Sequence, residues 1–286
     1  MTSGKVLLRS ALAVALPLQF SAIKAQEQAT DSHLALVRQA LATELRAASD
    51  TQHPMRYRLH KTSPRFSTIK DIVETKDGAV ARLLAMNDQP LSAADEQKEA
   101  VRLDALLADP SKQRHRKQSE DADTARALKV LRALPDAFDY TYIGPCPPPA
   151  EHCDHFSFQP NANFDPPDLE TQALVHMAGE IRIDTQDQRV LRLEGHLQQD
   201  VDFGWGMLGR LNKGGWIIID QSDVGDHQWR IVRFQMVMSG RVFFKTRAFD
   251  TLEEQSKFTP LPAGMGYAQA IQLLRSDPAK PIAASQ

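Results

Sequence analysis

The sequence predicts an α+β protein with a single curved antiparallel β-sheet, a half-barrel of about ten strands, that carries an N-terminal helix and an inserted helical lid. Three observations support this fold class. Apolar residues recur every three or four positions near the N-terminus and again over residues 92–134, which is the period of an amphipathic helix. Most other segments alternate apolar and polar residues, as half-buried strands do. Because no helical pattern separates the later strands, the sequence excludes a doubly wound parallel sheet.

The N-terminal part of the fold is predicted to contain one helix and three strands. Leu34, Val37 and Leu41 lie three and four residues apart, which predicts a helix over residues 31–49. Alternation with a period of two then predicts strands over residues 55–61, 68–76 and 79–86. Asp77-Gly78 stands between the last two strands and favours a hairpin, because glycine adopts the positive φ of a tight turn.

The lid is predicted as a pair of helices inserted after the third strand, over residues 92–108 and 118–134. Between them stands a basic run at residues 112–117. This run is interpreted as a solvated turn between helices rather than as a binding patch, because short charge runs usually face water.

Beyond Pro135 the chain is predicted to be almost entirely β, with antiparallel neighbours joined by short turns at Asp187-Gln188 and Ser239-Gly240. The predicted strands cover residues 138–143, 155–159, 173–184, 189–203, 215–221, 229–239 and 241–249. The strand over 189–203 is longer than usual and contains Gly195, so we expect it to bend. The tail from residue 259 is rich in Pro, Gly and Ala and is predicted to hold a short helix near 267–274.

The N-terminus has the features of a secretory signal peptide. Lys5 and Arg9 precede an apolar run over residues 10–23, and Ala25 is a small residue at the expected cleavage site. The run is short for a membrane-spanning helix, and no later stretch is long and apolar enough for one. We therefore predict a signal peptide at residues 1–25, a half-barrel domain at 26–258 with its lid at about 92–134, a tail at 259–286, and a periplasmic location. The alternative is an amphipathic first helix of the mature fold.

Charge and cysteine content narrow the class of protein. The 34 basic and 36 acidic side chains give a formal charge of −2, which argues against a nucleic-acid partner. Cys146 and Cys153 are the two cysteines, and in an exported chain they are expected to form one disulfide across a Pro-rich turn. The alternative is a zinc site that adds His152 and His155.

No enzyme is expected, because the sequence lacks the motifs that carry common chemistries. It contains no Gly-x-Ser-x-Gly nucleophile turn, no phosphate-binding loop and no His-Glu-x-x-His zinc helix. The glycines over residues 204–209 lead into a strand rather than a helix, so they are interpreted as a hairpin connection. Asp200 with Asp202, and Glu194 with His196, are interpreted as surface groups. We predict no catalytic residue, no metal and no cofactor.

The strand faces predict an apolar surface that could hold a ligand. One face of the later strands collects leucine, valine, phenylalanine and methionine, and the last two adapt to irregular apolar shapes such as acyl chains. The same residues could instead form core beneath the lid. The predicted ligand-lining residues are Leu191, Leu193, Leu197, Phe203, Val232, Phe234, Met236 and Phe244 from the sheet, with Val101, Leu106, Leu128 and Leu131 from the lid.

Two segments carry a resemblance to a known family: HMAGEIRIDTQDQRVLRLEGHLQQDVDFGWGMLGRLNKGGWIIIDQ and DHQWRIVRFQMVMSGRVFFKTRAFD. They contain a strand ending in Ile-Asp, a strand alternating Arg and Glu, a Gly-Gly hairpin, and a final strand pair with Trp229 and Gly240-Arg241. This half resembles the periplasmic lipoprotein-carrier superfamily typified by LolA, LolB and RseB, and the order of elements over about residues 31–258 resembles that fold.

The resemblance implies a half-barrel under a helical lid that binds a lipid or the acyl chains of a lipoprotein. We therefore expect an exported binding protein, with a function in lipid or lipoprotein trafficking. The alternative is an envelope sensor or protein-interaction module of the same fold, filled by its own side chains and binding an envelope protein instead of a lipid.

Overall fold

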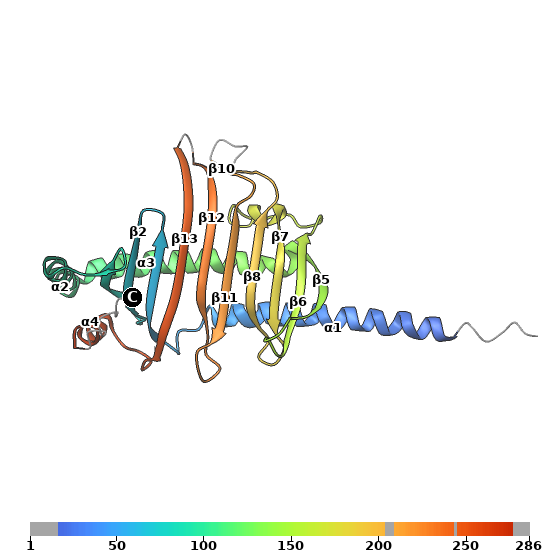
Figure 1. Cartoon of the computed structure of the whole chain (residues 1–286), viewed down its shortest axis with the longest axis horizontal. Coiled ribbons are helices and arrows are strands. Elements are labelled where there is room, and N and C mark those ends of the chain that lie inside the picture. The colour runs from blue at the N-terminus through green and yellow to red at the C-terminus, as the bar shows by residue number, and fades with distance from the viewer. Residues whose placement is uncertain (1–16, 204–208, 243–244, 277–286) are drawn as a thin grey trace, which may run out of the picture.

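The computed structural model describes residues 17–203, 209–242 and 245–276, and their arrangement confirms the predicted fold class (Figure 1). Within these ranges, 13 strands form one open antiparallel sheet. The strand order is β4-β3-β2-β1-β13-β12-β11-β8-β7-β6-β5, with β10 and β9 continuing beside the upper end of β12. Because β1 pairs with β13, the first and last long strands lie side by side and join the two halves of the chain.

The elements have the following bounds. The helices are α1 (Pro17–Ala47), α2 (Ala93–Ala108), α3 (Pro110–Ala137) and α4 (Tyr267–Ser276), with a 3₁₀ helix η1 at Gln172–His176. The strands are β1 (Met55–Ser63), β2 (Phe66–Val73), β3 (Val80–Met86), β4 (Gln89–Pro90), β5 (Phe138–Pro145), β6 (Cys153–Pro160), β7 (Met177–Asp184), β8 (Arg189–Leu197), β9 (Val201–Phe203), β10 (Gly209–Leu211), β11 (Trp216–Asp223), β12 (Trp229–Val242) and β13 (Lys245–Pro260).

Helices α1 and α3 lie along one face of the sheet, which we call the inner face (Figure 1). The 28 residues of α3 span about 42 Å at the helical rise of 1.5 Å per residue. The sheet from β3 to β5 is about 43 Å wide, from nine spacings of about 4.8 Å. Helix α3 therefore crosses the whole width of the sheet, from the β3 side to its junction with β5.

The main core fills the inner face at the β5–β8 end. Phe156 and Ile183 are 0 % exposed and pack against Val37 and Leu41 of α1 and Leu134 of α3. Glu44 of α1 forms a buried ion pair with Arg189 at the start of β8, with Oε1 2.8 Å from Nε and Oε2 3.0 Å from Nη2. This ion pair fixes α1 to the sheet.

A second core lies at the opposite end, where α4 covers the outer face of β2 and β3. Val73 and Val80 form a cross-strand pair and are 0 % exposed. They share a cluster with Leu103 of α2 and with Ile271 and Leu274 of α4. The two helices thus protect the outer face where the sheet ends.

Helix α2 also closes the free edge of β3. Glu99 Oε1 accepts a hydrogen bond from the Leu83 amide at 2.9 Å, and Arg102 donates one to the Ala81 carbonyl. Arg116 of α3 donates to the Ala79 carbonyl at 3.3 Å. Side chains therefore satisfy edge groups that would otherwise be open to another strand.

The predicted turn over residues 112–117 is wrong, because α3 begins at Pro110 and continues through this run to Ala137. The Asp109 carboxylate accepts a hydrogen bond from the Ser111 amide at 3.0 Å, and proline suits the first helical turn. Lysine, arginine and glutamine are good helix formers, so the segment needs no apolar stripe to be helical.

Three predicted strand boundaries are also corrected. The strand over 173–184 begins only at Met177, because η1 occupies Gln172–His176. The strand over 189–203 breaks after Leu197 into β8 and β9, so the bend lies beyond Gly195. The last hairpin turns after Val242 rather than at Ser239-Gly240, and both of its strands are longer than expected.

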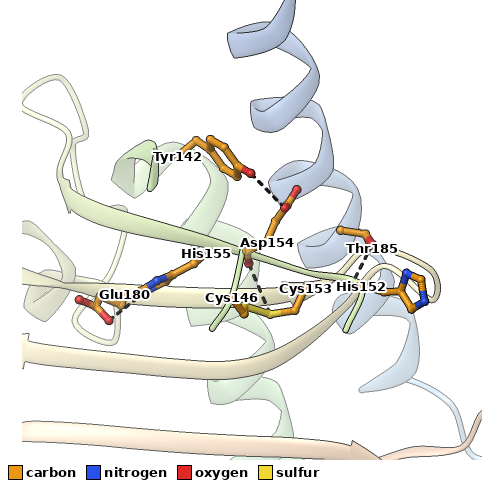
Figure 2. Close-up of a disulfide and its surroundings, with 8 residues drawn as sticks. All are labelled: Tyr142, Cys146, His152, Cys153, Asp154, His155, Glu180 and Thr185. Atoms are coloured by element: carbon orange, nitrogen blue, oxygen red, sulfur yellow. Dashed lines mark hydrogen bonds and ion pairs between the residues drawn. A yellow bond between two sulfur atoms is a disulfide. The ribbon is translucent and has the colours of Figure 1, made fainter. Parts of the chain in front are cut away.

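The disulfide between Cys146 and Cys153 is confirmed, and it closes the loop between β5 and β6 (Figure 2). The Cys146 amide also donates to the Cys153 carbonyl at 2.7 Å. Both sulfurs are bonded to each other, so the alternative zinc site lacks its thiolates, and His155 instead contacts Glu180 at 2.9 Å. Closing such a short loop contributes about 2–3 kcal/mol in the chain-entropy description.

Helix α1 includes the expected cleavage site at Ala25 and continues beyond β5 at its N-terminal end (Figure 1). Cleavage after Ala25 therefore stays a prediction. Among the helices that the structure describes, none is both long and apolar enough to cross a bilayer.

Candidate ligand-binding face

The central strands carry a continuous row of side chains on the inner face. Strand register places Leu193 opposite Ile219, Ile219 opposite Phe234, and Phe234 opposite Glu253. Paired residues point to the same face, and Leu193 packs against the main core beneath α1 and α3. Leu193, Ile219 and Phe234 are only partly buried, whereas Ile181, the next member of the row on β7, is 0 % exposed.

A second row runs parallel to the first. Ile217 pairs with Met236, and Met236 pairs with Thr251. All three are partly buried. Gly195 lies opposite Ile217, and a Cβ at this glycine would come within 2.8 Å of Met177 Sδ. The small residue therefore leaves room for the Met177 side chain in this part of the face.

Helix α3 crosses these rows without packing on them. Residues 121–127 of α3 are all exposed. A helix that packs on a sheet buries a residue every three or four positions, so seven consecutive exposed residues have no packed stripe. On both sides the helix is held: Gln113 Nε2 donates to the Asp77 carbonyl at 2.8 Å, and Leu134 lies in the main core. The described part of α3 is thus a strap, fixed at both ends, over a partly open apolar surface.

The structure brings together three of the predicted lining residues on this surface: Leu193, Phe234 and Met236. Leu197 is on the same strand as Leu193 but is only 2 % exposed. Phe203 is partly buried in the short β9–β10 hairpin, and Phe244 lies outside the described residues.

Two other predicted lining residues, Leu191 and Val232, stand at β-bulges. The β7–β8 register pairs Ile183 with Val190 and Arg182 with Arg192, so Leu191 is the extra residue. The β11–β12 register pairs Asp220 with Arg233 and Gln221 with Ile231, so Val232 has no partner on β11 and is the extra residue. Strand pairing therefore does not assign either side chain to the inner face, and Val190 takes the buried position instead, at 5 % exposure.

The predicted lid residues are dispersed. Val101 is 55 % exposed on the surface of α2, and Leu106 is buried at 4 % in the second core with α4. Leu131 packs against the main core, and Leu128 is partly buried at the end of the exposed part of the strap. Of these four, only Leu128 and Leu131 belong to α3.

Polar groups that no sequence pattern indicates lie at the β1–β2 end of the inner face. Lys61 pairs with Glu253, with Nζ 2.7 Å from Oε1. Tyr57 is partly buried, and this burial raises its pKa, with Glu74 and Glu253 adding to the effect. Burial lowers the pKa of the nearby Lys70 ammonium, and the charges of Lys61, Arg102 and Arg116 lower it further. The face therefore passes from apolar side chains to charged ones of both signs.

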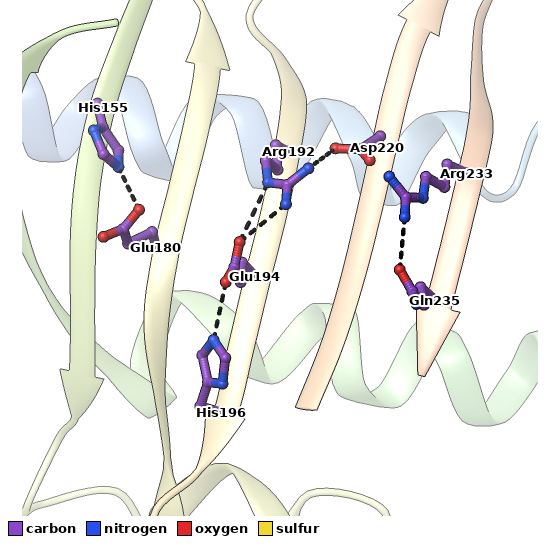
Figure 3. Close-up of polar contacts among 8 residues, drawn as sticks. All are labelled: His155, Glu180, Arg192, Glu194, His196, Asp220, Arg233 and Gln235. Atoms are coloured by element: carbon purple, nitrogen blue, oxygen red, sulfur yellow. Dashed lines mark hydrogen bonds and ion pairs between the residues drawn. The ribbon is translucent and has the colours of Figure 1, made fainter. Parts of the chain in front are cut away.

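The outer face of the same strands is polar, and several of its charges are paired (Figure 3). Arg192 contacts Asp220 at 2.7 Å and Glu194 at 3.0 Å, and Glu194 also contacts His196 at 3.0 Å. The hydrogen bond from His196 and the charge of Arg192 lower the pKa of Glu194. Glu194 and His196 thus belong to a surface ion network, in agreement with their interpretation as surface groups.

An open groove lies between η1 and β9, next to the part of α3 that contacts η1. It is lined by Pro166, Leu169, Gln172, Val175, His176, Val201 and Asp202. None of the predicted lining residues is among them. We therefore assign the candidate site to the inner face.

Within the described ranges, one group of side chains has atoms close enough to share a cation: Asp187, Asp223 and His227, whose ligand atoms lie within 4.8 Å of one another. Asp187 already accepts a hydrogen bond from Trp229 Nε1 at 2.9 Å and lies 3.0 Å from His227 Nδ1. These contacts account for the cluster without a metal.

The Asp187–His227 contact predicts a measurable titration. The hydrogen bond and charge of Asp187, with the charge of Asp223, raise the pKa of His227. In Asp187→Asn the carboxylate charge is lost, so we expect the His227 pKa to fall, as followed by NMR of the imidazole protons against pH. Asp226→Asn removes a weaker influence and should lower it less. An unchanged pKa in Asp187→Asn would contradict the contact.

Comparison with known proteins gives no relative. No family model matches the chain, and neither the curated proteins nor the solved structures include a significant match.

Proposed function

We propose that the protein binds the acyl chain of a lipid on the inner face of the sheet, beneath the strap formed by α3. The observation that carries this proposal is that the strap and the sheet beneath it are both solvent-accessible where the strap crosses the apolar row. Residues 121–127 of the strap are all exposed, and the apolar row that the strap crosses is only partly buried. The apolar row is therefore accessible to solvent and lies beneath a helix. Such a surface suits a long, narrow apolar ligand that fits between the sheet and the helix.

Burial of the ligand supplies the binding energy. Each methylene removed from water contributes about 0.8 kcal/mol, so roughly ten buried methylenes contribute roughly 8 kcal/mol before the cost of ordering the chain is subtracted. Phe234 and Met236 offer an aromatic ring and an adaptable thioether to such a chain. No bond is made or broken in this function.

Both ends of α3 are held, so we propose that the ligand enters from the side of the strap. At one end the Ala79 amide donates to Glu120 Oε2 at 2.9 Å, and Gln113 is 2 % exposed. At the other end Ala133 and Ala137 are buried in the main core. Opening by lifting either end would expose these groups, whereas side entry leaves them in place.

The proposal includes export to the periplasm and a function in lipid or lipoprotein trafficking. The charged start, apolar run and small residue at position 25 support export. The disulfide supports an oxidising compartment.

Purification followed by lipid extraction and mass spectrometry tests the function. We expect lipid at a stoichiometric ratio to protein, or, with delipidated protein, saturable binding of a fluorescent fatty acid that unlabelled fatty acid displaces. Absence of both results would overturn the proposal and favour a protein-interaction module of the same fold.

A further inference from the structure

Lys70 places an ammonium group at one end of the apolar face. It pairs across strands with Leu59 on one side and Leu83 on the other. It lies two residues from Thr68, which continues the inner row through Lys61 and Glu253. Its side chain therefore belongs to the inner face. In the part of the chain that the structure describes, Lys70 is partly buried, and no carboxylate forms an ion pair with its ammonium group.

The charged groups around Lys70 are already engaged with other partners. Lys61 is paired with Glu253. Arg102 contacts Glu99 at 2.6 Å, and this carboxylate also accepts from the Leu83 amide. Arg116 donates to the Ala79 carbonyl. Glu253 and Glu99 are thus used by Lys61 and Arg102, and Glu120 accepts from the Ala79 amide, so none of these carboxylates is paired with Lys70.

The position of Lys70 relative to the apolar row fits one kind of ligand. Lys70 is on β2, and Phe234 is on β12, three strand spacings or about 14 Å away. This separation matches a long acyl chain with its polar end at β2 and its methylenes over β13, β12 and β11. A partly desolvated ammonium group without a counterion favours an anion at that end.

We propose that Lys70 binds the anionic head of the ligand, so that the protein selects single-chain anionic amphiphiles such as fatty acids over neutral ones. This inference rests on the proposed function, because it assigns the polar end of the same ligand. The apolar row supplies affinity, and Lys70 supplies the preference for charge and the direction in which the chain lies.

Competition binding with two ligands of equal chain length tests the inference. Myristic acid and myristyl alcohol each displace a fluorescent fatty acid from the wild-type protein, and we expect the acid to bind at least about tenfold more tightly, as a charge-assisted hydrogen bond provides. Lys70→Gln should remove this preference by weakening the acid alone, and Lys70→Arg should restore it. Lys98→Gln, which changes a lysine that is 77 % exposed on α2, is the matched control and should change neither affinity.

The results separate three failures. If Lys70→Gln weakens the binding of the acid and of the alcohol equally, or changes neither affinity, the assignment of Lys70 is overturned. The proposed function is not affected by this result. If acetate or inorganic phosphate displaces the probe as effectively as myristic acid does, the site binds free anions. This result would overturn the assignment to an amphiphile. If neither ligand binds the wild-type protein, the proposed function and this inference both fall.

Discussion

Replacing Glu44 with leucine is expected to lower the free energy of unfolding by about 3–5 kcal/mol, because it leaves the Arg189 guanidinium buried without its counter-charge. Both side chains are 10 % exposed, so water does not replace the lost contacts. The Val190 amide, which donates to Glu44 Oε1 at 2.9 Å, loses its acceptor as well. Equilibrium unfolding in urea, followed by circular dichroism, measures the change.

The double variant Glu44→Leu with Arg189→Met is the informative companion. It removes both charges, so we expect it to lose less stability than Glu44→Leu alone. Lys117→Met breaks an exposed pair with Asp121 on the strap and should cost less than about 1 kcal/mol. A double variant that loses the sum of the two single changes would contradict the account of a coupled buried pair.

Replacing Phe234 with aspartate is expected to weaken acyl-chain binding by about two orders of magnitude. A carboxylate beneath the ligand must lose its hydration when the chain binds, which costs several kcal/mol, and about 2.7 kcal/mol corresponds to a hundredfold change. Because Phe234 is only partly buried, the fold should tolerate this change better than an equivalent one at Phe156. Displacement of a fluorescent fatty acid measures the affinity.

Gln235→Asp is the matched control, since it adds the same charge one residue along β12 but on the outer face. There Gln235 already accepts a hydrogen bond from Arg233 at 2.7 Å (Figure 3), so an acidic side chain has a ready partner. We expect binding to be unchanged. Circular dichroism and urea unfolding of both variants separate loss of binding from loss of fold. Equal loss of binding in folded Phe234→Asp and Gln235→Asp would contradict the assignment of the inner face.

Much of the fold could be predicted from the sequence, because each strand carries its own pattern. Alternation in Ile181, Ile183, Phe234 and Met236 was enough to identify strands and to place Phe234 and Met236 on one face. The hairpin at Asp77-Gly78 is present, and Gly78 has a φ of 93°. The disulfide followed from two cysteines in an expected oxidising compartment.

Two kinds of feature could not be predicted in this way. A β-bulge changes the face of every later residue, and no local pattern announced the bulges beside Leu191 and Val232. The start of the strap gave a misleading signal, since residues 112–117 contain no apolar side chain. A segment without apolar residues can be either a turn or a helix that packs against nothing, and the sequence does not distinguish the two. The position of Lys70 depends on strand register, so the charged end of the site had no local signature either.

The side chains of α2 and α3 that occupy the edge of β3 have a consequence for how copies of this protein can associate. Ala79, Ala81 and Leu83 have their outward backbone groups bonded, and β4 pairs with Ala85 and Met86 beyond them. At the other end, no described strand pairs with the far side of β5. Because edge groups that are already bonded cannot pair with a further strand, we expect strand-to-strand contact between copies of the chain at the β5 border and not at the β3 border.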